Sequence, residues 1–387
     1  MKFSEVIGQE EVRKRLVGMV SGGRLPHAMM FCGPKGCGKM ALALSFASYL
    51  LCAGRDESHE ADSCGICRQC AMLRKWEHPD LHFTYPTIKL PSMSSDHKPV
   101  SDDFSREWRE MLRSEGPYFT MDRWLREMGA ENQQAIITAG ESDSLTRKLS
   151  MKSSQGGYKV SLIWLPERMN AECANKLLKL IEEPPSQTVF IMVCEEPDKL
   201  LETIRSRTQR IDIHKIDNGS VEKAIMARDR NMTPEDARRI ARIANGNWLK
   251  VIEETAPGNE AMEFLDLFQM LMRLAYMRNV KELKKWSDTL QSFGREKQKR
   301  FLDYFMRLIR ENFMYNFREP SLVYMTSREE EFARNFSRFV NEYNIFPICD
   351  LAGRAARDIG QNANARMVFF DFAMQMIVLL IQKKENS

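Results

Sequence analysis

The feature that most constrains the fold is a glycine-rich turn that joins an expected strand to an expected helix. The apolar run 28–32 predicts a short strand, and residues 39–52 predict a helix. Between them, residues 33–40 read Gly-Pro-Lys-Gly-Cys-Gly-Lys-Met, which matches a phosphate-binding loop at every defined position but the last. Strand, turn and helix in this order predict an α/β core, with a nucleotide-binding-like site formed by Gly33, Gly36, Gly38 and Lys39.

The last position of this loop argues against ATP hydrolysis. Met40 stands where the pattern has Ser or Thr, whose hydroxyl ligates Mg²⁺, and a thioether is a poor ligand for that hard cation. The expected strand 159–164 is where an ATPase carries an acidic pair, but here the chain continues as Trp164-Leu165. Glu167 is the nearest carboxylate, and its use as a substitute stays an alternative. The sequence predicts a chain that does not hydrolyse ATP alone, and it leaves binding of ATP or ADP without turnover open.

Four cysteines form the strongest local cluster. Three of them are separated by two residues each, and a fourth lies just upstream. Thiolates at this spacing can surround one tetrahedral ion, which is typical of structural zinc sites, and Gly65 lets the segment turn tightly. The predicted ligands of a structural Zn²⁺ are Cys52, Cys64, Cys67 and Cys70. The alternatives are His59 in place of Cys52, and a set of unrelated buried thiols.

Length and composition set the outer limits. The chain has 387 residues, 43% of them hydrophobic, which predicts two or three domains with sizeable cores. A formal net charge of +4 is too small to indicate nucleic-acid binding by itself. The N-terminus lacks the apolar core of a signal peptide, and the most hydrophobic stretch, 367–381, contains Asp371 and Gln375; we therefore expect a cytoplasmic protein without a membrane span. Nine cysteines in such a protein favour metal binding or buried thiols over disulfides.

The rest of the first 215 residues alternates between strand and helix patterns. Further strands are expected at residues 159–164, 188–193 and 210–213, and further helices at 10–20 and 170–183. The stretch 86–158 is mixed, with Ser- and Asp-rich pieces and helical pieces that contain Trp and Met. It predicts an insertion or a surface excursion, with its Trp and Met side chains in a small core.

Several motifs follow one another in an order that resembles a known family. Residues 7–10 read Ile-Gly-Gln-Glu and residues 24–28 read Arg-Leu-Pro-His-Ala; the glycine loop and the cysteine module come next. Residues 175–185 read Asn-Lys-Leu-Leu-Lys-Leu-Ile-Glu-Glu-Pro-Pro, and residues 203–207 read Thr-Ile-Arg-Ser-Arg. Together they resemble the AAA+ subunits of bacterial clamp loaders, over about residues 1–255.

The resemblance implies a role for one arginine. In that family, the arginine of a Ser-Arg-Cys motif reaches into the ATP site of the neighbouring subunit as an arginine finger, where it stabilises charge on the transferring phosphoryl group. The corresponding residues here are Ser206 and Arg207, with Thr208 in place of the Cys. The family's second sensor arginine falls near Leu249, beside Lys250, which is a further departure from a competent ATP site. A chain that keeps the residue used on a neighbour and lacks those used on itself is expected to be a non-hydrolysing ring subunit.

The resemblance also implies domains and partners. The expected domains are an AAA+ core at 1–213, with the zinc module at 52–70 and the insertion at about 86–158, a helical lid at 214–256 and an all-α collar at 257–387. Pro257-Gly258 is the expected linker. The chain would be a component of the DNA polymerase III holoenzyme, in a hetero-oligomeric ring with other clamp-loader subunits that loads the sliding clamp on primer-template DNA during replication. The basic run 295–300 could face DNA, although a solvated helix face is the simpler interpretation.

Two other functions stay open from the sequence. An ATP-hydrolysing motor subunit of the same clamp loader would hydrolyse ATP as an isolated chain and would use Glu167. A zinc-bearing DNA-binding module would bind DNA tightly without partners and would depend on the four cysteines. ATP hydrolysis by the isolated chain, and by an assembly with and without Arg207, distinguishes these functions.

Overall fold

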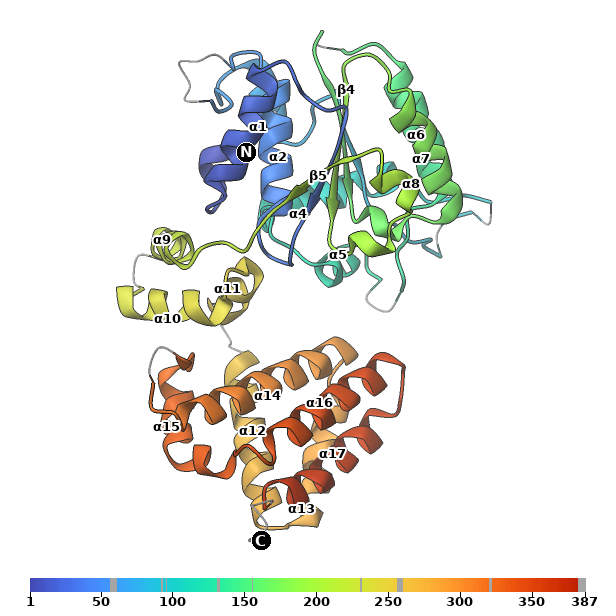
Figure 1. Cartoon of the computed structure of the whole chain (residues 1–387). Helices are drawn as coiled ribbons and strands as arrows, with labels where there is room; N and C mark the ends of the chain where they lie inside the picture. The colour runs from blue at the N-terminus through green and yellow to red at the C-terminus, as the bar shows by residue number, and fades with distance from the viewer. Residues whose placement is uncertain are drawn as a thin grey trace. The chain divides into compact units, whose positions relative to one another are not determined.

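The computed structural model describes residues 1–55, 61–91, 93–94, 96–130, 133–154, 156–229, 232–255, 260–319 and 322–381. The alternative ligand His59 and the expected linker at 257–258 lie outside the described residues. The chain divides into two compact units, Met1–Val251 and Ile252–Ser387, and each is described here by itself (Figure 1).

The first unit is built on a five-stranded parallel sheet. The strands are β1 (Ala28–Cys32), β2 (Leu81–Thr84), β3 (Lys159–Trp164), β4 (Thr188–Cys194) and β5 (Gln209–Asp212), in the order β2-β3-β4-β1-β5. The register pairs Cys32 with Cys194 and with Asp212, so the strand ends meet at the edge where the glycine loop begins. All residues of β1, β3 and β4 are buried, as expected for parallel strands covered on both faces. The α/β core predicted from the sequence is confirmed.

Eleven helices of the first unit are described, with α11 continuing past residue 251. They are α1 (Glu10–Ser21), α2 (Lys39–Leu51), α3 (Arg68–Arg74), α4 (Ser105–Ser114), α5 (Met121–Glu127), α6 (Ala139–Ser150), α7 (Ala171–Glu182), α8 (Glu202–Arg205), α9 (Asn218–Arg228), α10 (Pro234–Ala244) and α11 (Trp248–Thr255). Short 3-10 turns occur between them, for example at Pro166–Arg168.

Helices cover the two faces of the sheet in separate groups (Figure 1). Alternate residues of β1 divide between them: Met29 and Phe31 join the core under α1 and α2, whereas Met30 joins the core under α6 and α7. Every residue of α2 is buried, which matches a helix that is apolar on all sides. Helix α2 is therefore packed into the core over its whole length, and this fixes the position of the glycine loop at its start.

The segment expected as an insertion or a surface excursion contributes large side chains to the main core. Trp108 of α4 and Trp124 of α5 are fully buried and lie edge to face, with ring centroids 5.1 Å apart. Trp108 also lies 5.4 Å from Trp164 at the end of β3, and the Trp124 Nε1 donates to the Pro86 carbonyl at 2.8 Å. The Trp and Met side chains are core residues, as the sequence predicted, but they extend the main core over the end of the sheet rather than forming a separate small one.

Helices α9, α10 and α11 follow β5. Asp217 and Thr233 cap α9 and α10 by accepting hydrogen bonds from backbone N–H groups three residues on. Helix α10 ends at Ala244, and the next two residues, Asn245 and Gly246, both have positive φ. This turn carries the next residues back toward the glycine loop.

The described residues of the second unit form helices and the loops that connect them, with no strand. Its helices are α12 (Glu260–Tyr276), α13 (Val280–Gln291), α14 (Arg295–Tyr315), α15 (Ser327–Phe336), α16 (Ile345–Gly360) and α17 (Ala365–Leu379). One apolar core joins them, with Phe268, Trp286 and Phe301 fully buried at its centre. Among the described helices of both units, none is long and apolar enough to span a membrane.

Candidate functional site

The fold requires a glycine at three positions of the loop, either because a Cβ would clash or because the backbone has a positive φ. A Cβ built on Gly33 would lie 2.2 Å from the Ile213 carbonyl oxygen, just past β5. Gly38 caps α2 with a φ of +93°, which side chains disfavour. Gly36 has a φ of +70°, and a Cβ there would lie 1.8 Å from the Asn247 side-chain oxygen. The glycines are thus needed by the fold whether or not phosphate is bound.

The lysine of the loop is turned into the loop itself. Lys39 is buried, and its Nζ donates to the carbonyls of Gly33 at 2.8 Å and Pro34 at 2.7 Å. These carbonyls satisfy two of the three ammonium hydrogens. In this conformation the Lys39 ammonium is hydrogen-bonded to the backbone of its own loop rather than directed at a phosphate.

Two residues distant in sequence cover the loop. The Trp248 N–H donates to the Gly36 carbonyl at 3.0 Å, which seats the start of α11 on the turn. Tyr118, between α4 and α5, lies over Gly38, where a built Cβ would be 3.3 Å from its hydroxyl oxygen. Burial raises the pKa of Tyr118. Tyr118 and Asn247 thus both lie against the glycine loop in this conformation.

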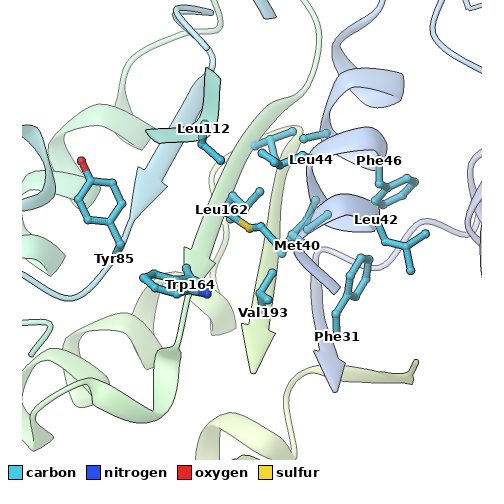
Figure 2. Packing of buried hydrophobic residues seen from close by; sticks show 14 of the residues in the cluster. Phe31, Met40, Leu42, Leu44, Phe46, Tyr85, Leu112, Leu162, Trp164 and Val193 are labelled. Carbon is cyan, nitrogen blue, oxygen red and sulfur yellow. The ribbon is translucent and has the colours of Figure 1, made fainter. Parts of the chain in front are cut away.

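Residue 40, where the loop pattern has a hydroxyl ligand for Mg²⁺, is packed among apolar side chains. Met40 is 6% exposed and belongs to the same core as Leu162, Trp164 and Val193, which lie around it in Figure 2. Glu167 lies beyond Pro166, where its Oε1 accepts hydrogen bonds from the N–H groups of Glu195 at 2.9 Å and Glu196 at 3.1 Å. This carboxylate thus caps the backbone after β4.

Sequence reasoning missed Tyr118 and Asn247 as parts of this site. Tyr118 lies in the mixed stretch whose path the sequence could not predict. Asn247 and Trp248 were noticed only as a part of the expected lid, and contact with a loop more than 200 residues earlier leaves no periodic signal. The sequence pair Asn245-Gly246 was the one local signal of a sharp turn there, and both residues have positive φ in the structure.

The four predicted cysteine ligands come together at the end of α2. Their sulfur atoms all lie within 4.8 Å of one another, and no other such group of His, Cys, Asp and Glu side chains occurs among the described residues. The Cys52–Cys64 and Cys64–Cys70 sulfur distances are 3.5 and 3.9 Å. A tetrahedral ion with bonds of about 2.3 Å to sulfur requires sulfur–sulfur distances of about 3.8 Å. The donor set therefore fits one tetrahedral metal ion.

Backbone N–H groups point at these sulfurs. Cys64 N–H donates to the Cys52 sulfur at 3.3 Å, Cys67 N–H to the Cys64 sulfur at 3.4 Å, and Cys70 N–H to the Cys67 sulfur at 3.4 Å. Burial acts to raise the pKa of Cys67, but hydrogen bonds from the N–H groups of Cys70 and Ala53 and with the thiols of Cys64 and Cys70 together lower the pKa to about 6. The thiolate form is thus favoured at neutral pH at Cys67, whereas burial raises the pKa of Cys52 and Cys70.

The candidate arginine lies at the surface of the first unit, just after the short helix α8. Arg207 is 42% exposed; its Nε contacts the Glu182 carboxylate at 2.6 Å, and its Nη1 donates to the Thr203 carbonyl at 3.1 Å. Ser206 donates to the same carbonyl at 3.2 Å. Thr208, which replaces the family's Cys, is buried and donates its hydroxyl to the Ile204 carbonyl at the end of α8. The structure does not bring Arg207 together with the glycine loop of its own chain through any described contact.

Comparisons with known proteins agree with the motifs. A family model described as "DNA polymerase III, delta subunit" matches residues 8–217, more than half of the chain. The delta' subunit of DNA polymerase III from Bacillus subtilis is 27% identical over 237 residues, which cover 61% of this chain and 56% of that protein. The Escherichia coli delta' subunit is 28% identical over 196 residues, 50% of this chain and 44% of that protein.

The gamma/tau subunit from Mycobacterium tuberculosis H37Rv is 32% identical over 206 residues, 53% of this chain and 27% of that protein. The chain therefore spans from about a quarter to just over half the length of these relatives. A solved gamma subunit-related protein from Thermotoga maritima aligns with 95% of this chain and 99% of its own, at a TM-score of 0.36 and 11% identity, which is too distant to support an argument. The family match and the delta' relatives confirm the resemblance read from the motifs: the chain belongs to the DNA polymerase III delta subunit family of clamp-loader proteins.

Proposed function

We propose that the chain is a delta'-like, non-hydrolysing subunit of a replicative clamp loader, which supplies Arg207 to the ATP site of a neighbouring subunit. The observation that carries this proposal is an asymmetry within one unit. The chain's own loop is covered by Tyr118 and Asn247 and its Mg²⁺ position is filled by Met40, whereas Arg207 is exposed. Within a ring, such a chain can act on a partner's nucleotide but not on its own.

Its partners would be the other clamp-loader subunits, and through them the sliding clamp and primer-template DNA in the cytoplasm. We assign the four cysteines to a structural Zn²⁺ held by Cys52, Cys64, Cys67 and Cys70, because four sulfur ligands complete a tetrahedron and leave no position for a substrate. The ion would tie the end of α2 to α3, since Cys52 follows α2 and Cys70 lies in α3.

The test is ATP hydrolysis by the isolated chain and by a clamp loader reconstituted from this chain and its partner subunits. We expect no hydrolysis by the isolated chain. Arg207→Ala should lower turnover at the site that it faces by about 10³-fold or more, because arginine fingers stabilise the transition state by that amount. Arg210→Ala is the matched control, since Arg210 is an exposed arginine of the same unit paired with Asp212. Equal rates for wild type and Arg207→Ala would refute the proposal.

The similarity to gamma/tau subunits favours a second candidate, an ATP-hydrolysing motor subunit. That function requires the cover over the loop to open and Glu167 to leave the backbone groups that it caps. Robust hydrolysis by the isolated chain, lost on Glu167→Gln, would establish it in place of the proposal above.

A further inference from the structure

We propose that Glu182 is a positioning residue for Arg207: its carboxylate orients the guanidinium for the neighbouring subunit's ATP and thereby raises turnover there. This inference rests on the proposed function of Arg207 and adds a second residue, from a different helix, to the same device. Glu182 is the last residue of α7, and Arg207 follows α8. The two side chains meet at 2.6 Å between the Arg207 Nε and a carboxylate oxygen.

Contacts at two of its nitrogens determine the plane of the guanidinium. Glu182 holds the Nε, and the Thr203 carbonyl accepts from Nη1 at 3.1 Å. A planar group held at two of its nitrogens cannot rotate about its long stem, so its remaining donors keep one direction. A further hydrogen bond, from Nη1 to the Ser206 hydroxyl at 3.4 Å, lies on the same side. The described contacts thus all lie at Nε and Nη1, and therefore Nη2 is the donor left for a phosphate oxygen of the partner.

The backbone that carries Arg207 is rigid, although the Arg207 side chain is exposed. Ile204, in α8, is fully buried in the core beneath α7, and the Thr208 hydroxyl donates to carbonyls at the end of α8 at 3.1 and 3.2 Å. The backbone on which Arg207 stands is thus fixed, and the freedom that remains is that of its side chain. Glu182 removes this freedom before the neighbouring subunit arrives.

The position of Glu182 is not explained by stability. A carboxylate at the C-terminal end of a helix is unfavourable with respect to the helix dipole. The ion pair is also about half exposed on both sides, and such pairs contribute little to folding. The contact is thus unfavourable for the helix and contributes little to folding, but it orients the one arginine assigned to a partner. We therefore explain the position of Glu182 by this orientation.

The test is a mutant cycle in the reconstituted clamp loader. Glu182→Ala should lower the ATP turnover number by about two- to tenfold with the KM for ATP unchanged, because the cost of ordering one long side chain then falls on the transition state. Glu183→Ala is the matched control: it removes an adjacent, exposed carboxylate for which no contact with Arg207 is described. In an Arg207→Ala background, Glu182→Ala should have no further effect, since it acts only through the arginine.

The outcomes separate the two ideas. If Arg207→Ala has no effect, the proposed function fails, and the positioning role of Glu182, which rests on it, fails as well. If Arg207→Ala lowers turnover but Glu182→Ala raises it or leaves it unchanged, the carboxylate restrains or ignores the arginine, and the positioning role is overturned. A loss that persists in the Arg207→Ala background also overturns it. Unchanged thermal stability of Glu182→Ala, measured alongside, confirms that the variant is folded.

Discussion

At the scale of single residues, the glycine loop shows how a binding signature can be retained for packing. Gly33 meets the Ile213 carbonyl and Gly36 meets the Asn247 side chain, so both positions exclude a Cβ without reference to phosphate. Lys39 is likewise committed to two carbonyls of its own loop. The residues that would identify an ATP site in the sequence are thus accounted for by contacts within the chain.

Replacing Gly36 by Ala should destabilise the first unit. The new methyl group would clash with Asn247 and would also be strained by the positive φ. Gly116→Ala is the matched control, because Gly116 has a φ of +75° but nothing within 4 Å of a built Cβ. We expect Gly36→Ala to lower the free energy of unfolding by about 1–3 kcal/mol more than Gly116→Ala does. Equal losses in urea denaturation would mean that Asn247 moves aside freely.

Restoring the hydroxyl of the loop should not restore catalysis. Met40→Thr places a ligand for Mg²⁺ in the sequence, but Trp164 and Leu165 still stand where the acidic pair is needed. Because Met40 is buried among apolar side chains, the variant should lose about 1–3 kcal/mol of stability. Met151→Thr, at an exposed methionine, should be close to neutral. ATP hydrolysis by isolated Met40→Thr would show that the second strand does not block turnover.

At the scale of elements, the cysteine module joins α2 and α3 through its thiols, next to Leu73 of α3, which packs in the core that contains α2. Cys52 ends one helix, and Cys67 and Cys70 begin the other. The N–H groups that point at the sulfurs are set by the Gly65 turn, which has a φ of +75°. An ion bound to these four sulfurs would therefore add to the packing of Leu73 in holding α3 to α2.

Removing the metal should loosen this region selectively. We expect one Zn²⁺ per chain by elemental mass spectrometry, none in Cys67→Ala, and an unchanged content in Cys349→Ala, whose thiol lies in the second unit. Because protons compete with the metal for the thiolates, the metal content should fall as the pH is lowered into the acid range. Hydrogen exchange in residues 61–74 should rise on release, and exchange in β4 should not. Full zinc content in Cys67→Ala would contradict the assignment.

The sequence predicted some elements better than others for physical reasons. Continuous apolar runs bounded by turn residues predicted β1, β3 and β4 to within a residue at each end. Strand β2 was missed because its four residues, Leu-His-Phe-Thr, carry too little periodicity, and α6 was missed because its buried face includes Glu141 and two serines. Contacts such as Asn247 with Gly36 or Glu182 with Arg207 depend on how elements pack, which one sequence does not encode as a local pattern.

At the scale of the whole molecule, each unit has its own core, and the second also has a buried charge network. The Glu329 carboxylate is almost fully buried; it accepts from the Tyr304 hydroxyl at 2.7 Å, from Arg307 at 2.5 Å and from the Thr326 N–H at 2.8 Å. Burial acts to raise the pKa of Glu329, but Arg307 and these hydrogen bonds outweigh it and leave the pKa below its ordinary value of 4.5. The ionised form therefore stabilises the folded second unit.

This network makes the second unit sensitive to acid. A depressed folded-state pKa contributes stability that is present above pH 4.5 and is lost as the pH falls through the folded-state value. At pH 7, Glu329→Gln should cost about 3 kcal/mol, because it removes the charged carboxylate from Arg307, and the cost should shrink as the pH is lowered below 4.5. Glu330→Gln, at a partly exposed neighbour, is the control. Hydrogen exchange should show the change in α14 and α15 and not in β1; a cost independent of pH would refute the account.

The apolar filling around Met40 has a consequence for how such a chain can change over generations. Under the proposed function, turnover at this chain's own loop would take new residues at Met40 and Trp164 and the removal of Tyr118 and Asn247 from the loop. Each of these changes, made singly, would open a packed core or remove a close contact without giving turnover. A count of ATPases by the glycine pattern alone would then include chains of this kind.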